Sequence, residues 1–167
     1  MRYVPSREEL SAALNEVDNQ SDRGAAIILG ALVELALEAT LEQGWPEISN
    51  TMRARVFEGT GPLATFSAKI EVGHASGVFG PTTRANLHLI RKIRNEFAHR
   101  WEPLGFEADR VRRLCSNLKL LRDDWFEADN AKTVLRNQYE RVAKTTIVMF
   151  STRGYAPHPP AIYGSLA

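Results

Sequence analysis

One apolar segment near the N-terminus constrains the fold more than any other part of the sequence. Residues 24–33 include no polar side chain, and they lie in a helical segment, from about residue 22 to residue 42, that is apolar almost all round. Such a helix has to be surrounded by protein or by lipid. Ten residues are too few to cross a bilayer, and Glu34 and Glu38 follow at once. We therefore expect a buried central helix and no association with a membrane.

Helical periodicity continues through most of the chain. Ser6 and Glu9 fit a capping box, and Asp22 is the expected N-cap of the central helix. Beyond these positions, apolar residues recur at intervals of three and four. The further helices predicted from this spacing cover about residues 7–17, 62–76, 81–100, 107–122 and 129–150, with a short helix around 52–57.

The fold class follows from these elements. No stretch alternates polar and apolar residues as a half-buried strand does, and no linker divides the chain. The tail, residues 153–167, holds three prolines and two glycines, which prevents a helix. We expect an all-α, single-domain bundle of about six helices over residues 1–152, followed by an extended or disordered tail.

Composition excludes several classes of protein. The chain has 167 residues, of which 44% are hydrophobic and 25% charged, as in soluble globular proteins. Cys115 is the only cysteine, so no internal disulfide can form, and its place on the apolar side of a helix favours a core position over a nucleophile. The four histidines lack the spacing of a metal site. We expect a cytoplasmic protein without a metal or another cofactor.

Charge is distributed unevenly, although the net charge is only +1. Residues 1–58 carry 5 basic and 10 acidic side chains, a net of −5, whereas residues 84–122 carry 10 basic and 4 acidic ones, a net of +6. Either the two halves attract each other within the fold, or the basic half forms a surface for an anionic partner. No helix-turn-helix is recognisable there. The candidates for phosphate contacts are four cations on the predicted helix 107–122, namely Arg110, Arg112, Arg113 and Lys119.

The stretch IRKIRNEFAHR, residues 90–100, combines arginines, an asparagine and a histidine. On a helix that turns by about 100° per residue, Arg94 falls within the apolar arc. Arg91, Asn95 and His99 fall on the polar side, with His99 about 140° away from Arg94. A guanidinium that faces the body of the protein needs an acidic partner, because an unpaired buried charge is very costly.

The predicted central helix offers that partner. Glu34 and Glu38 form an acidic stripe on it, and Arg23 lies on the same edge. Lys69, on the predicted helix 62–76, is a further cation that ordinary surface exposure would explain. One hypothesis is a buried ionic network that fixes the register of the helices, and the alternative is a polar cleft that binds a ligand. Both use the same residues, which are Arg23, Glu34, Glu38, Lys69, Arg91 and Arg94.

Three blocks of the sequence resemble a known family. They are DRGAAIILGALVELALEATL at 22–41, GPLATFSAKIEVGHASGVFG at 61–80 and LHLIRKIRNEFAH at 87–99. Together with the residues that follow, up to about 121, they are similar in order and spacing to the mannitol operon repressor family. The resemblance implies an all-helical bacterial regulator of the mannitol operon or of a related one. It also implies repression without a recognisable DNA-reading element.

A second, shorter resemblance concerns RNEFAH, residues 94–99. These residues match the R-x4-H pattern of HEPN-type helical domains, many of which are metal-independent RNases that act as dimers. The resemblance implies that His99 acts as general acid or base, that Arg94 stabilises charge on the reacting phosphate, and that Asn95 orients a phosphate oxygen. Because Arg94 and His99 diverge on one helix, such a site would need two helices from a dimer.

The longer resemblance decides the functional prediction. We expect a transcriptional regulator that acts through a protein partner, because a direct DNA reader should carry a recognition helix and a strongly basic face. The alternative is a HEPN-like metal-independent RNase, or an inactive relative, that uses Arg94 and His99. An enzymatic role is the less favoured of the two. Direct nucleic-acid binding has no motif to support it, and a homodimer is left open.

Overall fold

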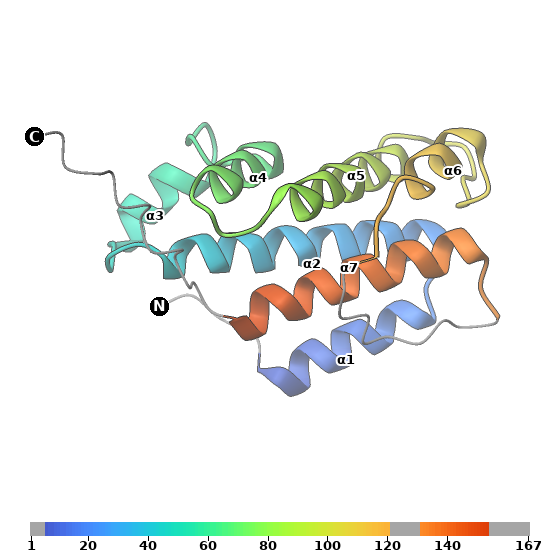
Figure 1. Ribbon diagram of the computed structural model, residues 1–167, viewed down its shortest axis with the longest axis horizontal. Helices are drawn as coiled ribbons and strands as arrows, with labels where there is room; N and C mark the ends of the chain where they lie inside the picture. The colour runs from blue at the N-terminus through green and yellow to red at the C-terminus, as the bar shows by residue number, and fades with distance from the viewer. Residues whose placement is uncertain (1–5, 121–130, 154–167) are drawn as a thin grey trace, which may run out of the picture.

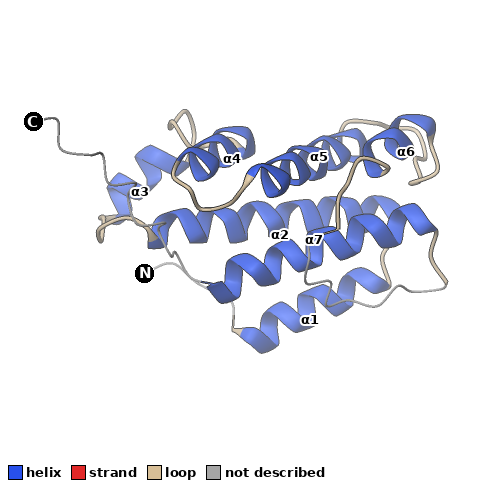
Figure 2. Cartoon of the chain, in the orientation of Figure 1, coloured by secondary structure: helices blue, strands red, loops and turns tan. Residues whose placement is uncertain are grey.

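The structure is a computed structural model that describes residues 6–120 and 131–153 (Figure 1). These residues form seven α-helices and no strand (Figure 2). The predicted all-α fold class is therefore confirmed, with one helix more than the expected number of about six. The predicted tail lies outside the described residues, except for Arg153, which ends the last helix.

The helices follow one another along the chain with loops between them. Their bounds are Arg7–Asp18 for α1, Asp22–Gln43 for α2, Asn50–Phe57 for α3, Phe66–Ala75 for α4, Pro81–Ala98 for α5, Asp109–Cys115 for α6 and Val134–Arg153 for α7. The short helix expected near residues 52–57 is α3, and it accounts for the additional element.

Side-chain caps define where several helices begin. Ser6 and Glu9 form the predicted capping box at the start of α1. At the start of α2 the prediction was wrong by one residue, because the hydroxyl of Ser21, and not the carboxylate of Asp22, accepts from the amide of Gly24 at 3.2 Å. The Asp22 carboxylate is therefore available for contacts with other parts of the chain.

α2 passes through the middle of the molecule (Figure 1). α4, α5 and α6 lie in a row on one side of it, and α1 and α7 lie on the other. The buried face of α2 includes Ala26, Leu29, Val33 and Leu37. By length and composition alone, α2 could also span a membrane, but half of its most apolar 18-residue window is buried against the rest of the protein. In this fold α2 is the core helix that the sequence predicts.

α7 contributes Tyr139 to a row of aromatic side chains in the core. The Tyr139 ring is fully buried, and its hydroxyl donates to the carbonyl oxygen of Ala26 on α2 at 2.8 Å. Burial raises the pKa of Tyr139 above its ordinary value, so the hydroxyl keeps its proton. The centroid of this ring lies 5.4 Å from that of Phe106, which lies 5.0 Å from that of Phe97 on α5. The row joins α7 to α5 through the loop that precedes α6.

α6 is shorter than predicted. It covers Asp109–Cys115 instead of residues 107–122, and residues 116–120 are not helical. The Asn86 side chain on α5 explains this end, because its Nδ2 donates to the carbonyl oxygen of Lys119 at 2.7 Å and its Oδ1 accepts from the Lys119 amide at 3.0 Å. α7 begins at Val134, whereas the predicted start at residue 129 lies outside the described residues.

Candidate functional site

The acidic stripe of α2 surrounds a buried lysine. Lys69 on α4 places its Nζ 2.9 Å from Oε1 of Glu34 and 2.7 Å from Oε2 of Glu38. Its side chain is only 5% exposed. The expectation of an ordinary surface lysine is therefore wrong, because two carboxylates one helical turn apart compensate for the loss of hydration of the ammonium group.

Arg94 on α5 also binds Glu34 of this stripe. Its Nη1 donates to Oε2 of Glu34 at 2.7 Å, and its guanidinium lies 5.4 Å from the centroid of the Phe66 ring. The absence of a side chain at Gly30 makes room for it, since a Cβ there would lie 2.9 Å from the Arg94 Cβ. Arg94 thus faces the body of the protein and meets an acidic partner on α2.

A third cation completes the arrangement. Arg53 on α3 forms ion pairs with Glu38, Glu42 and Glu58. Partial burial alone would lower the pKa of Arg53, but the neighbouring Glu42 and Glu38 raise it above its ordinary value. The sequence analysis missed Arg53, although Glu42 extends the Glu34–Glu38 spacing by one more turn and so signals a further cation. We call the set of Glu34, Glu38, Glu42, Arg53, Lys69 and Arg94 the α2 acidic cluster.

Two of the predicted members lie outside this cluster. Arg23 reaches the opposite end of the molecule, where its Nη2 donates to the carbonyl oxygen of Glu102 at 2.6 Å. Arg91 makes no ion pair within the described part of the chain, and its buried Nε has no hydrogen-bond partner there. The structure therefore brings neither residue into the cluster. For Arg23 the reason is that a helical wheel gives a direction around the helix axis but not a position along it. For Arg91 the wheel already indicated the polar side of its helix, away from Arg94.

The three residues of the R-x4-H pattern are not gathered at one point. The Nε of Arg94 lies 3.4 Å from Oδ1 of Asn95, and Arg94 is otherwise occupied by Glu34. His99 follows the last residue of α5 and is exposed, and no side-chain contact joins it to either residue in the described part of the chain. One copy of the chain therefore does not assemble the phosphate site that this resemblance implies.

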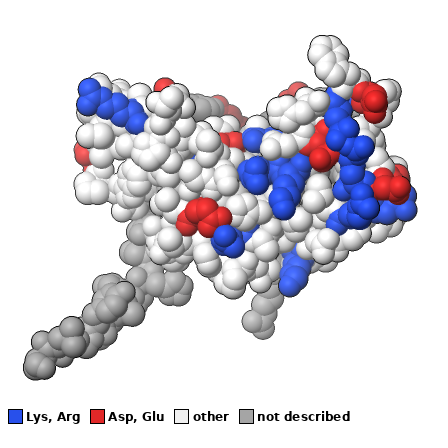
Figure 3. All heavy atoms as spheres, turned by 90° about the horizontal axis from the view of Figure 1, so that it is seen from above, with Lys and Arg blue, Asp and Glu red and all other residues white. Residues whose placement is uncertain are grey.

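The basic side chains of α5 and α6 share one face. Figure 3 shows Lys and Arg atoms gathered there with Asp and Glu atoms among them. Arg110 lies 3.5 Å from Glu96, and Arg112 donates to the carbonyl oxygen of Glu107 at 2.8 Å. Arg113 and Lys119 are exposed and form no ion pair with other described residues. The face is mixed in charge. Residues 99–108 separate α5 from α6, which is longer than the turn of about three to four residues in a helix-turn-helix.

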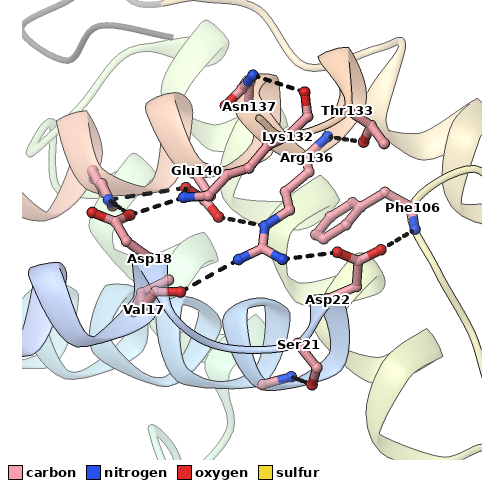
Figure 4. Close-up of polar contacts among 12 residues, drawn as sticks. Val17, Asp18, Ser21, Asp22, Phe106, Lys132, Thr133, Arg136, Asn137 and Glu140 are labelled. Carbon is pink, nitrogen blue, oxygen red and sulfur yellow. Dashed lines mark hydrogen bonds and ion pairs between the residues drawn. The ribbon is translucent and has the colours of Figure 1, made fainter. Parts of the chain in front are cut away.

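A second ionic cluster, which the sequence analysis did not predict, joins α1, α2 and α7 (Figure 4). The guanidinium of Arg136 lies between Glu140, at 2.8 Å, and Asp22, at 3.0 Å. Asp22 also accepts from the Phe106 amide at 3.1 Å. Partial burial alone would lower the pKa of Arg136, but Glu140 and Asp22 raise it above its ordinary value. The only signal in the sequence was the Arg136–Glu140 spacing of four residues.

Asp18, at the end of α1, is a further acidic residue of this cluster. Its Oδ1 accepts from Lys144 at 2.7 Å and from Lys132 at 3.0 Å. Partial burial alone would raise the pKa of Asp18, but the hydrogen bonds from these two lysines hold it below its ordinary value. The first and last helices of the described chain are thereby held together by charge.

The chemistry of both clusters is that of structural ion pairs. Neither includes a histidine or a cysteine, and no group of three metal-ligating side chains occurs among residues 6–120 and 131–153. Cys115 is buried, and its burial raises the pKa of the thiol to about 12, so it is a poor nucleophile. The α2 acidic cluster pairs its carboxylates with three cations and joins α2 to α3, α4 and α5.

Comparison with known proteins bears on the fold. No protein-family model and no curated protein matches the sequence. The fold is similar to that of MtlR. The similar chain belongs to the X-ray structure of the MtlR–HPr complex from Escherichia coli, with a TM-score of 0.65 and 16% sequence identity. The match covers 85% of the present chain and 98% of that chain. At this identity the likeness establishes an MtlR-like fold and nothing further.

Proposed function

We propose that the protein is a transcriptional regulator, similar to the mannitol operon repressor, that acts through a protein partner. The observation that carries the proposal is the fold, because the match extends over 98% of the MtlR chain. The three sequence blocks that resemble the mannitol operon repressor family lie on α2, on the segment that includes α4, and on α5, which are the helices around the α2 acidic cluster. Under this proposal the protein acts in the bacterial cytoplasm.

The proposed partner is an HPr-type protein. MtlR is bound to HPr in the similar structure, which makes the HPr of the organism that encodes this chain the first partner to test. Direct reading of DNA has less support. The basic face of α5 and α6 includes Glu96, Glu107 and Asp109, which reduce its positive charge.

The proposal is tested with two titrations of the purified chain. Isothermal titration with HPr should give saturable one-to-one binding, with a Kd on the order of micromolar. A band-shift assay with the promoter of the adjacent operon should show no shift at physiological salt. Absence of HPr binding would remove the proposed partner. Promoter binding that is sequence-specific would replace protein contact by direct DNA reading.

A pair of variants controls the DNA titration. Arg112→Ala/Arg113→Ala removes two exposed cations from α6, and Arg55→Ala removes an exposed cation from α3. If α6 touches phosphates, the double variant should weaken DNA binding and reduce its salt dependence more than Arg55→Ala does. Equal effects would indicate attraction of DNA to positive charge in general.

The RNase alternative is tested on the same preparation. Its requirement is a guanidinium free to meet a phosphate, whereas Arg94 is held by Glu34 at 2.7 Å. Incubation with single-stranded RNA in the presence of a metal chelator should therefore leave the RNA intact. Cleavage that disappears in His99→Ala, with an unchanged circular dichroism spectrum, would favour the enzyme over the regulator.

A further inference from the structure

A small cavity lies where the start of α5 meets the C-terminal parts of α2 and α7. Its volume is about 110 Å³, and four of the described side chains that line it are apolar, namely Val78, Phe79, Met149 and Phe150. The ring centroids of Phe79 and Phe150 lie 5.7 Å apart. Gly73 on α4 leaves room for the Phe79 ring, because a Cβ at that position would lie 2.7 Å from it. Packing between α4 and α7 therefore holds the apolar wall in place.

The first turn of α5 presents backbone donors beside this cavity. Gly80 lines the cavity and is the N-cap residue of α5, so no side chain caps the helix. The first hydrogen bond of the helix runs from the Arg84 amide to the Gly80 carbonyl oxygen at 3.1 Å. The amides of Thr82 and Thr83 have no hydrogen-bond partner among the described residues. Such amides attract an anion through hydrogen bonds and through the helix dipole.

Thr83 adds a buried hydroxyl at the same place. The residue is only 8% exposed and lines the cavity, and its hydroxyl forms no hydrogen bond with any described residue. The other threonine of the lining, Thr40, differs in this respect, because its hydroxyl donates to the Ala36 carbonyl oxygen at 2.8 Å. A buried hydroxyl ordinarily has a partner, since leaving it unpaired is costly. The Thr83 hydroxyl is therefore a donor that lacks an acceptor within the described chain.

Charge and size together select the ligand. No charged side chain of the described residues lines the cavity, so the positive end of the α5 dipole decides the sign of the charge that it favours. A cavity of about 150 Å³ holds benzene, which has six carbon atoms, so a cavity of this size suits roughly four. We propose that the cavity binds a short-chain monocarboxylate of three or four carbon atoms. This inference does not rest on the proposed function.

The proposed pose uses each of these features. The carboxylate accepts from the amides of Thr82 and Thr83 and from the Thr83 hydroxyl, at the end of the cavity beside the exposed Gly80. The alkyl chain lies against Phe79 and Met149. So small a molecule buries little apolar surface, and the Kd should be on the order of millimolar.

An NMR titration of the isotope-labelled chain tests the ligand class with three probes. Butyrate has both the charge and the alkyl chain, 1-butanol has the chain without the charge, and inorganic phosphate has the charge without the chain. Butyrate should shift the amide signals of Gly80, Thr82 and Thr83 with a saturable Kd, and the other two probes should bind at least about tenfold more weakly. Absence of saturable shifts with butyrate would overturn the proposal. Equally tight binding of 1-butanol or of phosphate would overturn the proposed carboxylate class.

Thr83→Val tests the buried hydroxyl, because valine has a similar shape and cannot donate. It should weaken butyrate binding about tenfold, as expected for loss of a hydrogen bond to a charged group. Thr82→Val is the matched control, because Thr82 is exposed on the same turn and does not line the cavity. This control should change the Kd by less than about twofold. Equal effects of the two substitutions would overturn the role of the Thr83 hydroxyl.

Gly80→Ser tests the amides without weakening the fold. A Cβ at Gly80 would meet no heavy atom within 4 Å, so serine fits, and its hydroxyl can cap the first turn of α5. The cap should compete with the carboxylate and weaken butyrate binding about tenfold, while the Tm stays the same or rises. Gly80→Ala adds the Cβ without the acceptor and should retain binding. Undiminished binding in Gly80→Ser, or equal weakening in both variants, would overturn the placement of the carboxylate on these amides.

Discussion

Lys69 illustrates how burial changes the role of a single side chain. Its ammonium group sits between Glu34 and Glu38, and its side chain is 5% exposed. Lys69→Ala would leave two carboxylates close together in a partly buried site with less positive charge to balance them. Breaking such a buried ion pair from one side costs about 3–5 kcal/mol, so we expect Lys69→Ala to lower the free energy of unfolding by that amount. Urea denaturation followed by circular dichroism measures it.

Lys92→Ala is the control for that substitution. Lys92 is exposed on α5 and forms no ion pair with the described residues, so its removal should change the free energy of unfolding by less than about 0.5 kcal/mol. If Lys69→Ala and Lys92→Ala changed the free energy of unfolding by similar amounts, Lys69 would not be needed to balance Glu34 and Glu38. Arg53 and Arg94 would then be sufficient to compensate the two carboxylates.

Predictions for single residues were correct where the period of one helix alone determines the direction of the side chain. The direction of Arg94 depends only on the period of α5, and the sequence places it on the inner side correctly. The position of Lys69 depends on how the loop after α3 turns the chain back toward α2, and helical periodicity includes no such information. Arg53 was missed for the same reason. Both cations reach the acidic stripe from helices whose placement is a tertiary property.

Gly30 determines how closely α5 approaches α2. A Cβ at this position would lie 2.9 Å from both the Cβ and the Cδ of Arg94. The Cβ of Arg94 is attached directly to the backbone of α5, so side-chain rotation cannot move it away. Gly30→Ala should gain about 1 kcal/mol of helix propensity, but forcing the two helices apart costs about 1–3 kcal/mol. We expect a net loss of stability, together with a weaker Arg94–Glu34 contact. Thermal unfolding measures the net effect.

Gly24→Ala is the matched substitution on the same helix. Its Cβ would lie 2.9 Å from the Oε1 of Gln20, which can move away by rotation, and 3.1 Å from the Cβ of Gln20, which has to shift only slightly. The gain in helix propensity should then remain, so Gly24→Ala should leave the protein as stable as before or stabilise it by up to about 1 kcal/mol. If Gly30→Ala were equally well tolerated, close packing of Arg94 over Gly30 would not be a determinant of the fold.

For the helices, their presence was easier to predict than the residues at which they begin and end. The buried helix α2 and the amphipathic helix α5 follow from long apolar patterns that local sequence fixes. The end of α6 does not, because the Asn86 side chain on another helix binds both backbone groups of Lys119 and so competes with helical hydrogen bonds. Ser21 and Asp22 are both good capping residues, and the choice between them depends on Asp22 being drawn to Arg136 and Phe106.

In the whole molecule, the two ionic clusters act on different parts of α2. Near its N-terminal end Asp22 connects α2 to α7, and Asp18 joins α1 to α7. Farther along, Glu34 to Glu42 connect α2 to α3, α4 and α5. Among these contacts, Glu34–Arg94 is the one that joins the acidic segment 1–58 to the basic segment 84–122. The other cations of the two clusters, Arg53, Lys69, Lys132, Arg136 and Lys144, lie outside that basic segment.

The contact between Asp18 and α7 makes the stability of the fold depend on pH. Hydrogen bonds from Lys144 and Lys132 outweigh the effect of burial and lower the pKa of Asp18. Because the folded state has the lower pKa, the carboxylate stabilises the fold above its unfolded-state pKa, and this contribution disappears as the pH falls through the folded-state pKa. The urea midpoint should therefore decrease as the pH falls from about 5 to below about 3, and Asp18→Asn should reduce that decrease. Asp109→Asn, at the exposed start of α6, should leave the decrease unchanged. An equal decrease in Asp18→Asn and the unmodified chain would show that Asp18 does not link α1 to α7 in solution.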